Sequence, residues 1–169
     1  RMPRTVRLED LPAPDETFVP VGAIGDREGA PIGVDLREGH LLVAGPPRSG
    51  RTTTLASLGL AALRAAAPPV VTAFSARRQG LHLDGVRTVD VAEPGAVEAA
   101  LAQIDRDLSV GRQVLCLCDD ADAYPDEVSL RFEALARAPR DLPVRIVAAV
   151  DNRAALRAYG GLVPEIRKS

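Results

Sequence analysis

The hydrophobic residues of this chain fall into short continuous runs, separated by stretches with helical periodicity. Runs that are almost entirely apolar cover residues 41–44, 70–74, 113–118 and 144–150. Strands without polar alternation are typical of a parallel sheet that is covered on both faces. A shorter run with partial alternation, residues 86–91, predicts one more short strand.

The segments between these runs predict helices. After the first run, apolar residues recur at three- and four-residue spacing, which predicts a helix over residues 50–67 that a Pro-Pro pair ends. A second helix is expected over residues 94–108, with Pro94 near its start. Two further helices are expected at residues 126–138 and 153–159. Strands that alternate with helices indicate an α/β fold with a parallel sheet.

The first 40 residues differ from this pattern. Residues 1–16 are rich in proline and charge, and we interpret them as a leader that packs along the domain. Residues 17–24 and 31–36 resemble two short strands, and the glycine-containing segment 25–29 between them predicts a hairpin turn. We therefore expect a leader segment at residues 1–16 and a single domain at residues 17–169 that begins with a β-ribbon.

Composition limits the class of protein. A chain of 169 residues with 46% hydrophobic and 3% aromatic residues can form one core, built from Ala, Val and Leu. The net charge of −2 argues against a free-standing binder of polyanions, and Tyr124 and Tyr159 are too few for a stacking platform. We therefore expect no nucleic acid partner. No apolar run is long enough for a transmembrane helix.

The spacing of the cysteines and histidines does not indicate a catalytic site. Cys116 and Cys118 are two apart in one predicted strand, so they point to the same face and are poorly placed for a mutual disulfide. We interpret them as reduced core residues of a cytosolic domain, and a metal pair is the second alternative. His40 and His82 have no partner spacing, and we assign them no chemistry.

A glycine-rich loop lies between the first apolar run and the first helix. Residues 45–52, GPPRSGRT, fit the phosphate-binding pattern G-x-x-x-x-G-[K/R]-[S/T] in its required order of strand, loop and helix. Glycines permit positive φ and a close approach of backbone to phosphate, and the free amides at a helix N-terminus favour an anion. We expect the cradle to be formed by Gly45, Arg48, Ser49, Gly50, Arg51, Thr52 and Thr53. The alternative is a glycine-rich turn that arose by chance.

Arginine takes the place of the usual lysine in this loop. The guanidinium of Arg51 is planar and long, whereas lysine delivers a compact charge to the phosphates. Lys168 is the only lysine of the chain, so general composition is another explanation for Arg51. Either way, we expect nucleotide binding to survive better than hydrolysis.

Two carboxylates follow the apolar run at 113–118. This arrangement is the Walker B pattern of P-loop NTPases, in which Asp119 would hold Mg²⁺ opposite the hydroxyl of Thr52. Many such enzymes have a glutamate next, and Asp120 is shorter by one methylene, about 1.5 Å. Misplacement by about 1 Å can cost roughly 10²-fold in rate, so Asp120 is a weak replacement for the catalytic glutamate. A turn or helix cap is the alternative for the two carboxylates.

Two more loops are expected at the same end of the sheet. Asp151 and Asn152 follow the run at 144–150, where Asn152 could sense the γ-phosphate; a turn or helix cap is the alternative. Arg77 and Arg78 lie in the loop at 75–80 and could supply charge to the nucleotide of a neighbouring subunit. A solvated loop is the simpler interpretation of these arginines.

With these motifs in place, the chain resembles an FtsK/SpoIIIE-type ATPase domain, most closely the C-terminal ATPase modules of the type VII secretion protein EccC. The resemblance covers most of the chain and lies in the leader at 8–12, the ribbon segments 19–22 and 31–36, the loop at 45–52, and the Asp119–Asp120 strand. It implies a RecA-like P-loop fold that binds ATP and Mg²⁺. It also implies neighbouring ATPase modules in the same polypeptide, secretion substrate proteins as partners, an indirect link to a membrane channel, and a cytoplasmic location within a membrane-anchored complex.

Three functions remain open at this point. The altered positions Arg51 and Asp120 favour an ATP-binding module with weak or absent hydrolysis that acts in regulation or docking. The alternatives are an active motor ATPase that drives protein or DNA translocation, and a scaffold without nucleotide. A complete nucleotide-binding core would have at least one further strand, so we expect this chain to lack its last strand or strands.

Overall fold

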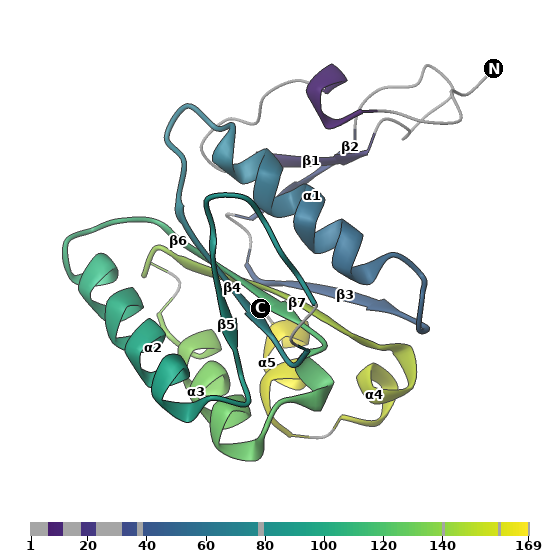
Figure 1. Ribbon diagram of the computed structural model, residues 1–169, viewed down its shortest axis with the longest axis vertical. Coiled ribbons are helices and arrows are strands. Elements are labelled where there is room, and N and C mark those ends of the chain that lie inside the picture. The colour runs from purple at the N-terminus through teal and green to yellow at the C-terminus, as the bar shows by residue number, and fades with distance from the viewer. Residues whose placement is uncertain are drawn as a thin grey trace.

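A parallel sheet forms the centre of the molecule (Figure 1). The computed structural model describes residues 7–11, 18–22, 32–36, 39–77, 80–139, 141–158 and 160–168. Within them the sheet has five strands in the order β3-β7-β6-β4-β5, and every neighbouring pair is parallel. The strands are β3 (Leu41–Gly45), β4 (Val70–Ser75), β5 (Arg87–Asp90), β6 (Val114–Asp119) and β7 (Val144–Asp151). The predicted α/β fold of P-loop type is confirmed.

Helices cover both faces of this sheet (Figure 1). They are α1 (Arg51–Leu63), α2 (Pro94–Ser109), α3 (Asp126–Ala136), α4 (Asn152–Arg157) and α5 (Leu162–Lys168), with short 3-10 turns η1 (Leu8–Asp10) and η2 (Ala121–Ala123). Helix α1 packs on one face, and the other four contribute to the core on the opposite face. No described helix is long and apolar enough to span a bilayer.

The central strands explain why their sequence has no polar alternation. In β6, Cys116 and Cys118 point into the core beneath α2 and α3, whereas Leu115 and Leu117 point into the core beneath α1. The side chains of β7 are divided between the two cores in the same way. Because both faces are covered, both sets of side chains must be apolar. The prediction that the two cysteines are free core residues on one face is confirmed.

A separate antiparallel ribbon lies beside α1. It consists of β1 (Phe18–Gly22) and β2 (Ile32–Asp35), as the sequence predicts, and β1 lies against α1. The expected hairpin turn at 25–29 lies outside the described residues. Near the end of α1, the Arg64 guanidinium donates to the carbonyl oxygens of Leu8 and Leu11, so that the first described segment is held against the helix.

Two helices, α1 and α5, differ most from the prediction. Helix α1 ends at Leu63, four residues before the expected end, and its last turn tightens where the Arg64 amide donates to the carbonyls of Ala61 and Ala62. The proline pair that follows disfavours helix in the residue before it. Helix α5 was not predicted, because two glycines precede it and Pro164 lies near its start. Proline is tolerated in a first helical turn.

Candidate nucleotide-binding site

The glycine-rich loop joins β3 to α1 and has the form of a cradle. The Ser49 amide donates to the Pro46 carbonyl at 3.2 Å, which closes the loop on itself. A Cβ atom on Gly45 would lie 2.4 Å from the Ser49 Oγ, so any larger residue there would force the Ser49 side chain to shift. Gly50, with φ of 90°, precedes the first residue of α1 in a left-handed conformation that favours glycine.

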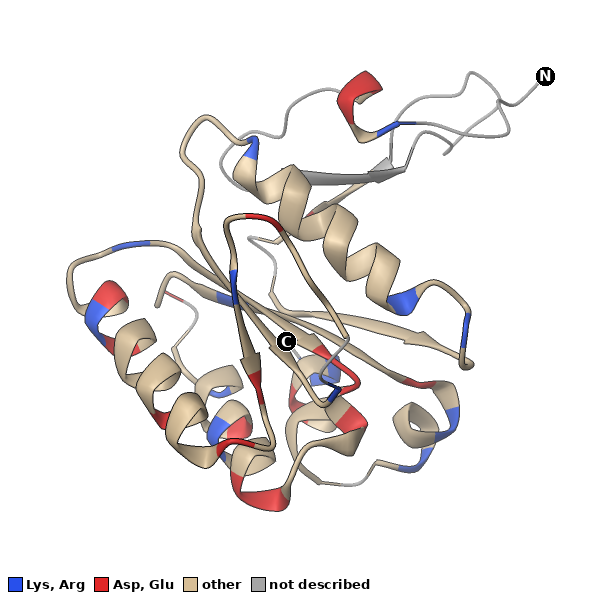
Figure 2. Ribbon diagram, viewed as in Figure 1, with Lys and Arg blue, Asp and Glu red and all other residues tan. Residues whose placement is uncertain are grey.

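Two residues with positive φ precede the start of α1. Arg48 also has a positive φ, 64°, and the alternation of left-handed residues in a loop can turn successive N–H groups towards one point. The first N–H groups of a helix have no partner within it, and the first turn of α1 contains no acidic residue that would repel an anion. Figure 2 shows basic positions in the loop before α1 and at the first turn of this helix.

The two predicted motifs meet at Thr52 and Asp119. The Thr52 hydroxyl lies 3.0 Å from each carboxylate oxygen of Asp119, although the two residues are 67 positions apart in the chain. Burial raises the pKa of Asp119, and the hydrogen bond from Thr52 partly opposes this effect. A divalent cation would stabilise the charged form of this carboxylate.

Arg51 extends across the site to Asp120. Its Nη2 lies 3.0 Å from the Asp120 Oδ1, and both side chains are about nine-tenths buried, with 10% and 9% of their surface exposed. The other terminal nitrogen, Nη1, is buried and has no hydrogen-bond partner among the described residues. An unsatisfied buried donor of this kind is unfavourable, and a phosphate oxygen would satisfy it.

Asp120 has a second cationic partner. The Nε of Arg77 lies 2.8 Å from the Asp120 Oδ2, so that each carboxylate oxygen contacts a different arginine. Asp120 has a positive φ of 50° at the turn after β6. Arg77 thus pairs within this chain, a contact that neither interpretation of the loop included, while its side chain remains 70% exposed. Its role towards a neighbouring subunit stays a prediction. Arg78 lies outside the described residues.

The tip of β7 lies between the two motif strands. Asp151 accepts a hydrogen bond from the Arg153 amide at 2.8 Å and caps α4, which is the structural alternative considered for this residue. Its own amide donates to Asp122 in the turn after β6. Asn152 is the first residue of α4 and is exposed. Its role as a sensor stays a prediction, as does the role of Thr53, which is exposed in the first turn of α1.

Sequence reasoning thus located the loops of the site but missed one of its contacts. The carboxyl ends of parallel strands meet at one edge of a sheet, so the cradle, the Asp119–Asp120 turn and the Arg77 loop were all expected there. The pairing of Arg77 with Asp120 was missed. The signal that could have found it is the position of Arg77 two residues after β4, the strand beside β6.

Solved structures share this fold. The fold is that of the ATPase domains of EccC and EssC. ATPases 2 and 3 of Thermomonospora curvata EccC, solved in complex with a signal sequence peptide, match 99% of this chain with a TM-score of 0.72 and 18% identity. ATPases 2 and 3 of EssC from Geobacillus thermodenitrificans match 90% of this chain with a TM-score of 0.69 and 15% identity. The chain covers 35% and 32% of these two structures, about a third of their length.

A third solved structure also matches the fold of this chain at low sequence identity. The cytoplasmic domain of the Thermomonospora curvata type VII secretion ATPase EccC matches 99% of this chain, at a TM-score of 0.71 and 17% identity, and the chain covers 23% of it. No protein-family model and no curated protein matches the chain. At these identities the likeness concerns the fold, and the predicted resemblance to EccC-type ATPase modules is confirmed at that level.

The residues present fit a magnesium-bound nucleotide. Thr52 and Asp119 offer a hydroxyl and a carboxylate oxygen, the ligand types that Mg²⁺ takes, and phosphate oxygens and water usually complete its shell. Within the described part of the chain, no group of three or more His, Cys, Asp or Glu side chains could hold a metal by itself.

Proposed function

We propose that this chain is an ATP-binding module of an EccC-like translocase of the FtsK/SpoIIIE family, with weak or absent hydrolysis and a role in regulation or docking. The amides of the cradle and Arg51 would hold the phosphates, and Thr52 and Asp119 would hold Mg²⁺. The ion would neutralise phosphate charge and orient the β- and γ-phosphates.

The contact between Thr52 and Asp119 carries this proposal. It unites a phosphate-cradle motif and a metal-binding motif that are far apart in sequence, at a separation of 3.0 Å. The unpartnered Arg51 Nη1 beside them supports an anionic ligand. A chance glycine-rich turn would explain neither feature.

The surroundings of Asp120 support slow hydrolysis. Its side chain is shorter than the glutamate it replaces, and both of its oxygens are engaged by arginines. A carboxylate with both oxygens engaged is a poor acceptor for the proton of an attacking water, since neither oxygen is free to approach it.

The proposed partners follow from the solved matches. EccC ATPases 2 and 3 were solved with a signal sequence peptide, and other matches are named as cytoplasmic domains of such ATPases. We therefore propose that this module works in the cytoplasm beside other ATPase modules, contacts secretion substrates, and is linked to a membrane channel through the larger assembly.

Calorimetry with Mg-ATP, followed by a turnover assay, tests the proposal. We expect binding without appreciable turnover, and a loss of the Mg²⁺-dependent part of the affinity in Asp119→Ala. Asp126→Ala, at the exposed start of α3, is the matched control and should bind as the unmodified chain does. Rapid turnover that Asp119→Ala abolishes would favour a motor ATPase instead. If the folded chain binds no nucleotide, a scaffold role is the alternative that remains.

A further inference from the structure

We propose that Arg77 is a positioning residue of the nucleotide site, which by holding Asp120 releases Arg51 for phosphate and keeps Asp120 away from water. This inference rests on the proposed nucleotide binding and adds to it a residue and a role. The loop that carries Arg77 lies outside both recognised motifs.

The Arg77 loop is built to hold its backbone in place. The Ser75 hydroxyl, on a residue that is 1% exposed, accepts from the Arg77 amide at 3.2 Å and donates to the Arg77 carbonyl at 3.0 Å. The Gly80 amide donates to the same carbonyl at 2.9 Å. The polar groups of the Arg77 backbone are therefore tied at the end of β4, which fixes the point from which its side chain extends.

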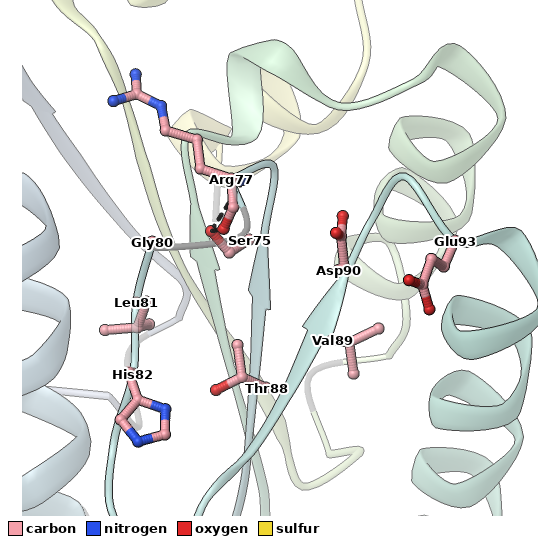
Figure 3. A pocket seen from close by; sticks show the side chains of 9 residues that line it. All are labelled: Ser75, Arg77, Gly80, Leu81, His82, Thr88, Val89, Asp90 and Glu93. Atoms are coloured by element: carbon pink, nitrogen blue, oxygen red, sulfur yellow. Dashed lines mark hydrogen bonds between the residues drawn. The ribbon is translucent and has the colours of Figure 1, made fainter.

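Arg77 has other acidic residues within its surroundings and does not turn towards them. It lines a pocket of about 760 Å³ between the segment after β4 and strand β5, and Asp90 and Glu93 line the same pocket. Figure 3 shows the guanidinium of Arg77 directed away from these two carboxylates. Its ion pair is with Asp120, although 70% of the Arg77 side chain is exposed. Arg77 thus pairs with Asp120 and not with the acidic residues of its own pocket.

Charge balance explains what this pairing would do. Asp120 is shared between Arg51 and Arg77, and Arg51 is also the first residue of α1, directly after the cradle loop. When phosphates draw Arg51 away, Asp120 would be left buried and unpaired, which is costly, unless Arg77 remains. Without Arg77, Asp120 would bind Arg51 more strongly and its bare charge would repel the phosphates. Both effects weaken nucleotide binding.

The same pairing would restrain hydrolysis. An arginine within hydrogen-bond distance occupies the carboxylate oxygen that a water would need. Removal of Arg77 should therefore lower affinity and leave the turnover per bound nucleotide equal or higher. A residue that only supports the fold would lower both quantities.

A double-mutant cycle tests the role of Arg77. Mg-ATP affinity is measured by calorimetry for the unmodified chain, R77Q, D120N and the double variant R77Q/D120N. We expect R77Q to weaken binding by about ten-fold, the size of one charged hydrogen bond, and to have no effect in the D120N background. R77K should restore part of the affinity, because it keeps the charge. If D120N is unstable, D120S serves the same purpose.

The matched control is Arg112. Its side chain is 64% exposed and pairs with Asp107, which is 6% exposed, far from the cradle at the end of α2. R112Q should leave affinity unchanged. Suppose that the unmodified chain binds Mg-ATP. If R77Q then binds it equally well, or if R77Q still loses affinity in the D120N background, the proposed role of Arg77 is wrong, whereas the proposal of nucleotide binding stands. If the unmodified chain binds no nucleotide, both proposals fall.

Discussion

Arg51 does something at this position that lysine could not do. One terminal nitrogen of its guanidinium contacts Asp120, and the other is buried without a partner among the described residues. A lysine has a single ammonium group, so it could not contact Asp120 with one nitrogen and offer a second nitrogen to another ligand. The longer cation and the shorter carboxylate at 120 therefore fit each other. Arg51 in place of lysine and Asp120 in place of glutamate are therefore best understood as two halves of one ion pair.

This pairing leads to a prediction for hydrolysis. The double change Arg51→Lys with Asp120→Glu restores a compact cation and a longer carboxylate, and we expect it to raise ATP turnover by roughly ten-fold or more, since about 1 Å of misplacement can cost up to 10²-fold. Turnover is measured by phosphate release. Arg51→Lys alone is the control and should gain little. A flat rate in the double variant would mean that another feature limits hydrolysis.

His40 has a structural role that its sequence context did not indicate. Its Nδ1 accepts from the Ile146 amide and its Nε2 donates to the Ala136 carbonyl, each at 3.1 Å, so the neutral ring joins the starts of β3 and β7 to the end of α3. Burial lowers the pKa of His40 from 6.5, with the charge of Arg145 acting in the same direction and the hydrogen bond to Ala136 opposing it.

A pH dependence of stability follows from this shift. Below pH 6.5 the unfolded chain binds a proton at His40 that the folded chain does not, so stability present above pH 6.5 is lost as the pH falls towards the lowered pKa. We expect the free energy of unfolding by urea to fall between pH 7 and pH 5. His40→Gln should reduce this slope and cost about 1–3 kcal/mol at pH 7.5.

The control for this prediction is the exposed His82, whose change to Gln should leave the slope intact. Glu165 contributes in a different range, because its hydrogen bonds to Arg137 and Lys168 lower its pKa from 4.5 to about 2. That contribution is lost only as the pH falls from 4.5 towards 2. A slope between pH 7 and pH 5 that His40→Gln leaves unchanged would contradict the role of His40.

At the scale of elements, α1 links the core to the cradle. Its first residues complete the cradle, and its buried face, which includes Leu55 and Leu58, packs on the sheet at 0% exposure. The orientation of the free amides thus depends on packing two turns away. Substitutions on the buried face of α1 should therefore also affect the nucleotide site.

The two faces of α1 give a matched comparison. Leu58→Ala removes a fully buried side chain and should lower the free energy of unfolding by about 2–5 kcal/mol. Leu60→Ala, on the same helix at 40% exposure, should cost much less. Chemical denaturation of both variants measures the difference. Equal costs would mean that α1 is held by contacts other than those of its buried face.

Sequence reasoning succeeded for elements whose signal is local. The strands of the sheet and helix α2 can be predicted from the spacing of their apolar residues alone. Each end of these elements lies within one residue of its expected position. Helix α5 was missed because Leu162, Val163 and Ile166 form a stripe of only two turns next to glycine and proline. The contact of Arg77 with Asp120 depends on strand order, which no local pattern encodes.

At the scale of the whole molecule, three loops from distant parts of the chain assemble one site. The cradle follows β3, the carboxylates follow β6, and Arg77 follows β4. A ligand that binds across them would favour only the folded state and so stabilise the entire sheet. The residues of the site are therefore coupled to global unfolding, even though each lies on a loop.

The sealed position of the two thiols makes this coupling measurable. Cys116 and Cys118 are at 0% exposure, and burial raises the pKa of Cys116 to about 12, so a thiol reagent would reach them only when the sheet opens. Saturation with Mg-ATP at about 100 times its Kd should then slow the labelling about a hundred-fold, and Asp119→Ala should cancel this protection. The chain thus contains its own reporter of ligand occupancy, without an added dye or tag.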